Sequence, residues 1–194
     1  GGIPVVGTPN LATATTDAGG AYSLTSFWGW SGTLVPEAPL GGAFLAASRT
    51  VNDLRQDLPD QDFVWAPDRV VSGRVTHEDT GAGVEGVTLT FAPDGGTATT
   101  SADGQYSKTL PHGWSGTIGA SFSSGSFAPA SRAQAALAAD RSGQDFTWLP
   151  PRTIAGRLLN EDTGAGLPGV GLYCGTTCVA TSGSDGGYQF TVQQ

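Results

Sequence analysis

The chain has 194 residues and a net charge of −8 at pH 7, and only 13% of its residues are charged. Its single lysine, Lys108, leaves no basic patch for phosphates or anionic lipids, so nucleic acids are not expected partners and no membrane insertion is expected. Asp17 is the only charged residue among the first 36, but Gly, Pro and Thr interrupt each apolar run there, which excludes a membrane span or a signal peptide in that stretch.

Two nearly identical stretches reveal an internal repeat. RVTHEDTGAGVEGVTLTF begins at Arg74, and RLLNEDTGAGLPGVGLYC begins 83 positions later at Arg157. Aromatic residues recur at nearly the same offset, namely Tyr22, Tyr106 and Tyr188, Trp30 and Trp114, and Trp65 and Trp148. A fixed period of this length is typical of small domains in a row. The sequence predicts three copies: a partial repeat at 1–66, a complete repeat at 70–149 and a partial repeat at 152–194.

The first copy begins at GGIPVVG, which aligns with GAGVEGVTLTF of the second copy, so it is expected to lack its first strand. The stretch SFWGW places Trp28 and Trp30 on one face of a strand. Trp30 has the counterpart Trp114 and is expected in the core, whereas Trp28 replaces a histidine of the second copy and is expected to be partly exposed. An exposed Trp28 would stack on a sugar ring or cover a contact between domains or subunits.

The second copy shows the pattern of a complete β-sandwich. VVSGRVT (70–76) and GVTLTF (86–91) alternate apolar and polar residues, and Asp103-Gly104 supplies hairpin-turn chemistry between two further short strands. The fifth, sixth and seventh strands are WSGTIGASF, SFAPASRAQAAL with a bend at Pro129, and QDFTWL. Residues 133–140 are alanine-rich, but their counterpart at 50–57 favours an extended strand and loop over a helix. Seven short strands with regular turn signals predict an all-β fold of tandem antiparallel sandwiches.

The third copy stops at YQFTVQQ and is expected to lack its last three strands. A sandwich without some of its strands exposes an apolar face and an unpaired edge. Two explanations are open: the sequence is part of a longer tandem array, or neighbouring copies complete the two ends, head to tail. Any targeting signal is expected to lie outside the sequence.

Cys174 and Cys178 lie in YCGTTCV of the third copy, where the second copy has a turn. Strand ends joined by Gly-Thr-Thr are expected to bring the two thiols within bridging reach, which favours a disulfide between them and an oxidising compartment. Zinc is the alternative, but it needs about four ligands, and neither histidine of the chain lies in this copy.

The junctions between copies, FVWAPDRVVSGRV and FTWLPPRTIAGRL, are short and contain proline. Such linkers are extended and semi-rigid, so consecutive sandwiches are expected to keep a fixed orientation. Arg69 and Arg152 occupy the same place in the two junctions, after Trp65 and Trp148, and are expected to lie over a tryptophan face or to pair with a carboxylate. These four residues and Trp28 are the predicted contacts between domains or subunits.

The sequence offers no catalytic constellation. His77 and His112 are the only histidines, and Asn160 and Trp28 stand at their places in other copies, so both are expected to be surface residues. Ser115 in GWSGT lacks the second glycine position of a nucleophile elbow. We therefore expect no enzymatic activity, no catalytic or metal-binding residue and no cofactor.

Acidic residues also recur between copies, namely Glu78-Asp79 and Glu161-Asp162, Asp57 and Asp140, and Asp62 and Asp145. No D-x-D-x-D-G loop occurs in the sequence. Capping of turns by side-chain oxygens is therefore the favoured interpretation, with structural calcium as the alternative.

The order of these motifs, from DTGAGVEGVTLTF through ATTSADGQYS and GWSGTI to FAPASR and GQDFTW, resembles the carboxypeptidase regulatory-like and Cna-B-like repeats. The resemblance covers all of the second copy, most of the first and the first half of the third. It implies the prealbumin-like (transthyretin-like) seven-stranded fold and a role as stalk, spacer or adhesive segment in bacterial secreted and cell-surface proteins.

Many Cna-B-like domains are also similar to one another in a Lys-Asn isopeptide bond that an acidic residue assists. Here Lys108 is the only lysine, and Asn10, Asn52 and Asn160 all lie outside the second copy. That crosslink is therefore not expected within the complete repeat.

The sequence thus predicts an extracellular structural protein, secreted or on the cell surface, that forms a stiff tandem stalk or a self-assembling filament subunit. Its expected partner is itself, head to tail or in tandem, and surface glycans are a further expected partner. Two alternatives stay open: an adhesin or glycan-binding segment with Trp28 as the stacking platform, and a non-catalytic spacer of a secreted hydrolase.

Overall fold

The computed structural model describes residues 2–192, and all regular secondary structure in this range is β-strand. The all-β prediction is therefore confirmed, as is the extended conformation expected at 133–140, where a short strand is followed by bends. Among the residues described, none belongs to a helix long and apolar enough to cross a membrane.

Contacts divide the chain into two compact units. Unit 1 comprises residues 1–71, 107–116 and 134–142, and unit 2 comprises residues 72–106, 117–133 and 143–194. The repeat boundaries inferred from the sequence remain a prediction.

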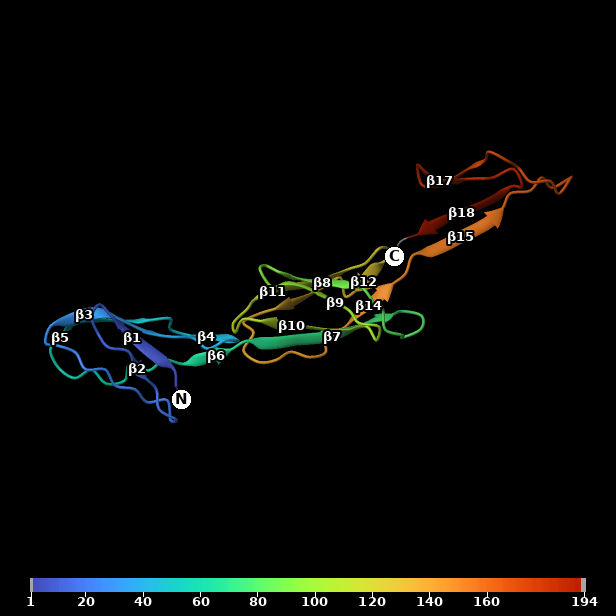
Figure 1. Cartoon of the computed structure of the whole chain (residues 1–194). Coiled ribbons are helices and arrows are strands. Elements are labelled where there is room, and N and C mark those ends of the chain that lie inside the picture. The colour runs from blue at the N-terminus through green and yellow to red at the C-terminus, as the bar shows by residue number, and fades with distance from the viewer. Residues whose placement is uncertain (1, 193–194) are drawn as a thin grey trace. The chain divides into compact units, whose positions relative to one another are not determined.

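Unit 1 contains a four-stranded antiparallel sheet in the order β2-β1-β3-β5 and a separate pair, β4-β6 (Figure 1). The strands are β1 (Pro4–Thr8), β2 (Ala14–Thr15), β3 (Trp30–Pro36), β4 (Gly42–Phe44), β5 (Arg49–Leu54) and β6 (Trp65–Pro67). Trp30, Leu34 and Val51 form a buried cluster on one face of this sheet. The core position predicted for Trp30 is therefore confirmed, since only 2% of its surface is exposed.

The strands from β7 to β14 form two four-stranded sheets, in the orders β10-β7-β14-β12 and β13-β11-β8-β9. Their bounds are β7 (Arg69–His77), β8 (Thr88–Ala92), β9 (Gly96–Thr99), β10 (Gln105–Leu110), β11 (Gly116–Ser121), β12 (Ser126–Ala128), β13 (Ser131–Gln134) and β14 (Phe146–Leu149). The predicted bend at Pro129 is confirmed, because it separates β12 from β13 and each of these strands joins a different sheet.

The antiparallel sandwich expected from the sequence is confirmed, with one parallel pair in addition. β7 and β14 run in the same direction, with Val75 opposite Phe146 and His77 opposite Trp148. These are the first and last strands of the second copy, and no tight turn connects them, so nothing forces them to be antiparallel. Val71 and Val75, which lie on the same face of β7, are fully inaccessible to solvent.

The last part of unit 2 contains two separate antiparallel pairs, β15-β18 and β16-β17 (Figure 1). The strands are β15 (Arg152–Arg157), β16 (Gly171–Cys174), β17 (Thr177–Thr181) and β18 (Gly187–Val192). Within residues 2–192, β15 is hydrogen-bonded to β18 along one edge only. Its apolar residues are correspondingly open to solvent, with Ile154 48% exposed.

Equivalent hydrogen bonds occur at the offset of the sequence repeat. The hydroxyl of Tyr106 donates to the carbonyl oxygen of Gln144, and that of Tyr22 donates to the carbonyl oxygen of Gln61 at 2.6 Å. The segment around Tyr22 is therefore placed relative to the segment around Gln61 in the same way as β10, which contains Tyr106, is placed relative to the segment around Gln144, just before β14.

Candidate functional site

The site begins with the loop EDTGAG at the end of β7. The loop closes on itself because the amide of His77 donates to the carbonyl oxygen of Ala82 at 2.8 Å, and the amide of Gly81 donates back to the carbonyl oxygen of His77 at 2.8 Å. Gly81 has a φ of 66°, in the left-handed region that favours glycine. The closed loop leaves the carboxylates of Glu78 and Asp79 at its surface.

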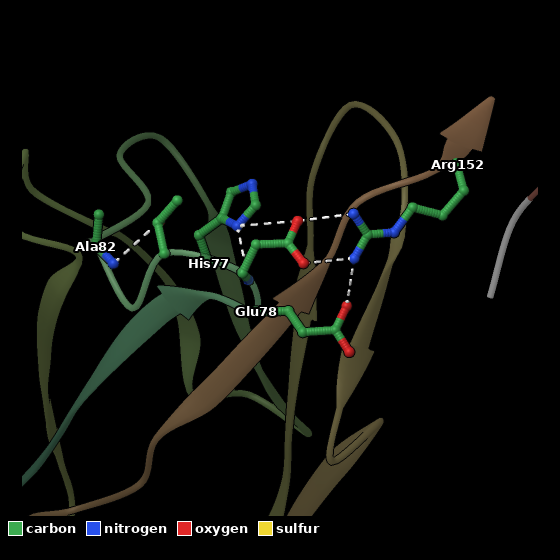
Figure 2. Close-up of polar contacts among 6 residues, drawn as sticks. His77, Glu78, Ala82 and Arg152 are labelled. Atoms are coloured by element: carbon green, nitrogen blue, oxygen red, sulfur yellow. Dashed lines mark hydrogen bonds and ion pairs between the residues drawn. The ribbon is translucent and has the colours of Figure 1, made fainter.

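Arg152 holds both of these carboxylates (Figure 2). One guanidinium nitrogen, Nη1, donates to Asp79 Oδ2 at 2.7 Å, while Nη2 donates to Asp79 Oδ1 at 2.7 Å and to Glu78 Oε2 at 2.9 Å. The planar guanidinium matches the two oxygens of a carboxylate, which gives this pairing a defined direction. We name these three residues the Arg152 clamp.

Within the clamp, Arg152 and Asp79 each stabilise the charged form of the other. The hydrogen bonds from Arg152 lower the pKa of Asp79, and the same bonds raise the pKa of Arg152. All three side chains are exposed to about two fifths of their surface, from 38% for Glu78 to 45% for Asp79. Asp79 and Arg152 therefore favour each other's charged form, and their exposure leaves the pair open to screening by salt.

The neighbouring end of β14 is fixed by Trp148. Its indole Nε1 donates to the carbonyl oxygen of Ser124 at 2.8 Å. Its ring meets the rings of His77 and Phe122 edge to face, with centroids 5.1 Å and 5.5 Å away. Of the two contacts considered for Arg152, the structure thus forms the carboxylate pair, while His77 and Phe122 contact Trp148.

Arg69, at the same place in the first junction, is in a different situation. Its Nε is buried and has no hydrogen-bond partner among the residues described. Trp65 pairs with Phe44 across the β4-β6 ladder and is 38% exposed. Trp28 is 73% exposed, and the guanidinium of Arg55 lies 5.9 Å from its ring centroid.

The predicted disulfide is not formed, and this expectation is corrected. Cys174 and Cys178 are both free and exposed. The β16-β17 ladder pairs Cys174 with Thr177 and Cys178 with Tyr173. Directly opposed residues share a face and neighbours alternate, so the two cysteines point to opposite faces of the hairpin. Of the three residues between the cysteines, Thr177 belongs to β17, so the turn is one residue shorter than the Gly-Thr-Thr turn expected from the sequence.

His77 and two of the recurring aspartates, Asp140 and Asp145, have identifiable local contacts. His77 Nδ1 accepts a hydrogen bond from the amide of Asp79 at 3.1 Å, and Asn160 caps the corresponding loop of the third copy in the same way. Asp140 and Asp145 accept hydrogen bonds of 2.9 and 2.8 Å from amides of β7. Within residues 2–192, no group of three or more His, Cys, Asp or Glu side chains is arranged to hold a metal ion.

Sequence reasoning did not identify Glu78 and Asp79 as the partners of Arg152. At these positions the sequence predicts turn residues, because a polar stretch beside glycine is typical of a loop. A usable signal was present: EDTGAG and a junction arginine both recur at the same offset.

Comparisons with known proteins assign no family to the chain. No family model matches the sequence, and no curated protein matches it. Among solved structures, a streptococcal ancillary pilin is similar at a TM-score of 0.38 and 12% identity, over 93% of this chain and 68% of that one. The Bacillus anthracis TIE protein is similar at a TM-score of 0.37 and 10% identity, over 98% of this chain and 34% of that one. Likenesses at this level assign no function.

Proposed function

We propose that the chain is an extracellular structural protein of secreted or cell-surface type, built from tandem β-sandwich repeats that serve as a stalk or filament shaft. In this function the repeats extend and connect, and they catalyse no reaction.

The observation that carries the proposal is the Arg152 clamp. Arg152 is the first residue of β15 and directly follows Pro150 and Pro151, which have restricted backbones. Its bidentate contact to Asp79 ties the start of β15 to the loop after β7. A link of this kind restrains the junction between two repeats. A stalk or filament shaft requires such a restraint, whereas a binding pocket or a catalytic centre does not require it.

The proposal is tested by removing the clamp in the full chain. Arg152→Ala is compared with Arg141→Ala, which removes an exposed arginine whose side chain forms no ion pair among the described residues. We expect Arg152→Ala to increase the mobility of the amides of Thr153 and Ile154 in backbone ¹⁵N relaxation, and to broaden the distribution of dimensions in small-angle X-ray scattering. Arg141→Ala should leave both unchanged. Equal behaviour of the two variants would remove the main support for the proposal.

A second candidate function, glycan binding, is favoured by one observation. Trp28 exposes 73% of its surface, which is unusual for the largest apolar side chain. Exposed indole rings stack on sugar rings. Binding to a glycan array that is lost in Trp28→Ala and retained in Phe27→Ala, whose ring is also exposed (58%), would support this function.

A further inference from the structure

The loop before β3 and the end of β5 carry three exposed side chains that meet at one place. Trp28 is 73% exposed, and the guanidinium of Arg55 lies 5.9 Å from its ring centroid. Arg55 Nε donates to Asp53 Oδ2 at 2.7 Å, and these two side chains are 63% and 55% exposed. We name the three residues the Trp28 platform. Because the guanidinium lies over one face of an indole that is still largely exposed, the other face is open to solvent.

Backbone hydrogen bonds hold the two parts of the platform together. The amide of Gly29 donates to the carbonyl oxygen of Leu54 at 2.8 Å, and the amide of Asp53 donates to Ser31 Oγ at 2.8 Å. A Cβ at Gly29 would lie 3.6 Å from Asp53 Oδ1, so this carboxylate lies beside the loop that carries Trp28. The site is therefore formed before a ligand arrives, which lowers the entropic cost of binding.

The second copy repeats this backbone without the platform. The amide of Gly113 donates to the carbonyl oxygen of Leu137, and the amide of Ala136 donates to Ser115 Oγ, each at 2.8 Å. The backbone is left-handed at both corresponding residues, with φ of 49° at position 53 and 40° at position 136. At the three platform positions the second copy has His112, Ala136 and Ala138. The fold thus requires none of the three platform side chains, which points to a function other than folding.

The exposure of the platform is a property of its place in the repeat. The second copy follows another repeat in the chain, yet Ala136 and Ala138 are exposed at the places of Asp53 and Arg55. His112, at the place of Trp28, is partly exposed. A preceding repeat therefore leaves this part of a sandwich accessible.

The chemistry of the three side chains suits a sugar ring. The open face of the indole stacks on the C–H groups of a pyranose, Asp53 accepts hydrogen bonds from sugar hydroxyls, and Arg55 donates to them. Charge favours a neutral sugar, because Asp53 already compensates the charge of Arg55. Residues 50–62 contain four aspartates and one arginine, and the net charge of the chain is −8. A carboxylate or sulfate on the sugar would therefore be repelled.

We propose that the Trp28 platform binds a neutral hexopyranose with equatorial hydroxyls, as in a β-glucoside. Trp28 lies against the C–H face of the ring, while Asp53 and Arg55 bind its hydroxyls. The inference rests on glycan binding, the second candidate function, and names the class of sugar and two further residues of the site.

The first test uses methyl β-D-glucopyranoside, added to the ¹⁵N-labelled full chain. We expect saturable shifts of the backbone amides of residues 27–30 and 53–55 in ¹H–¹⁵N NMR spectra. The matched ligand is methyl β-D-glucuronide, which has the same ring with a carboxylate at C6. It should bind at least about fivefold more weakly, because the site and the chain offer it no uncompensated positive charge.

The second test gives the platform positions the residues of the second copy, which the same backbone already accommodates. Trp28→His and Asp53→Ala should each weaken binding of the glucoside by about tenfold, because they remove the stacking surface and a charged hydrogen-bond acceptor. Asp53→Ala also leaves Arg55 uncompensated, so this variant should bind the glucuronide more tightly than the glucoside. A merely structural role of Asp53 would not reverse the preference.

The matched control is Thr50→Ala, on the same strand. Thr50 is exposed, and its counterpart in the second copy is Ala133, so the exchange follows the same rule outside the platform. It should bind both ligands as the wild-type chain does. Far-UV circular dichroism checks that each variant is folded.

The outcomes are distinct. No saturable shifts with the glucoside, or an Asp53→Ala variant that binds both ligands as the wild type does, would overturn the platform as a site for neutral sugars. Acidic glycans that bind on an array and are lost in Trp28→Ala would overturn the class of sugar but leave glycan binding in place. An array without any bound glycan would overturn both. None of these results alters the mobility measurements on Arg152→Ala, so the proposed structural function is judged separately.

Discussion

The hydroxyl of Thr100 donates a hydrogen bond of 2.6 Å to the carbonyl oxygen of Val84 and accepts one of 2.9 Å from the amide of Val87. Ser182 makes the same two contacts in the third copy, with Leu167 and Val170. In each of these two copies, a single hydroxyl thus satisfies two backbone groups of the chain leading into the second strand. Thr100 is only 4% exposed, so water does not substitute for it.

We expect Thr100→Val to lower the free energy of unfolding by about 1–3 kcal/mol, because it leaves a buried carbonyl and a buried amide unsatisfied. Thr100→Ser is the control, because it keeps the hydroxyl, and serine already makes the same contacts at position 182 of the third copy. It should lower the free energy of unfolding by less than about 1 kcal/mol. Urea unfolding followed by far-UV circular dichroism measures both. Equal costs for the two variants would contradict this account, because the hydroxyl would then contribute no more than the methyl group.

Tyr106 makes stability depend on pH in the alkaline range. Burial raises its pKa to about 12, from an ordinary value of 10.0. A phenol with a raised pKa stabilises the fold below pH 10, and this stability is lost as the pH rises through the folded-state value, so the window lies between pH 10 and about 12. The loss amounts to roughly 2–3 kcal/mol. Tyr106→Phe should remove this dependence, which urea midpoints at pH 9 and pH 11.5 would measure.

Gly83 lies where no side chain fits. A Cβ there would lie 2.1 Å from the carbonyl carbon of Asp103, which belongs to the backbone and cannot move aside. We expect Gly83→Ala to lower the free energy of unfolding by about 1–3 kcal/mol or more. Gly119→Ala is the matched control, because nothing lies within 4 Å of its Cβ position and its φ is not in the left-handed region. Similar unfolding midpoints for both variants would contradict the observed approach of the two backbones.

The clamp also predicts a response to acid. The pKa of Asp79 is lowered by the hydrogen bonds from Arg152, so the stabilisation is present above the ordinary aspartate value of 3.8 and is lost as the pH falls through the lower folded-state value. We expect the amide of Thr153 to become mobile only below pH 3.8 in the wild-type chain. In the Asp79→Asn variant, the amide of Thr153 should be mobile at every pH. Backbone ¹⁵N relaxation across the titration measures both chains. A wild-type chain in which this amide becomes mobile above pH 3.8 would contradict the prediction.

The cysteine hairpin gives a direct chemical test of strand register. With Cys174 and Cys178 on opposite, exposed faces, iodoacetamide should add two groups to the native protein without a reducing agent. Mass spectrometry counts the adducts. An unmodified native protein that accepts two groups only after reduction would mean that the hairpin adopts the register first expected from the sequence.

The strands of the second copy could be predicted from the sequence, because alternation of apolar residues reports directly which face of a sheet is buried, as Val71 and Val75 show. Pro129 marked a bend for a similarly local reason. The Arg152 clamp could not be predicted, since Asp79 and Arg152 are 73 positions apart and only the path of the chain brings them together. The cysteine register was also out of reach, because one residue of turn length reverses every face of a hairpin.

The parallel pairing of β7 with β14 has a mechanical consequence. The second copy starts with β7 and ends with β14, so tension applied to its two ends pulls these neighbouring strands in opposite directions along their length. The ladder between them is then sheared, and its hydrogen bonds must break together. An antiparallel hairpin at the same place would lose its hydrogen bonds one after another from its open end, and it would therefore yield at a much lower force.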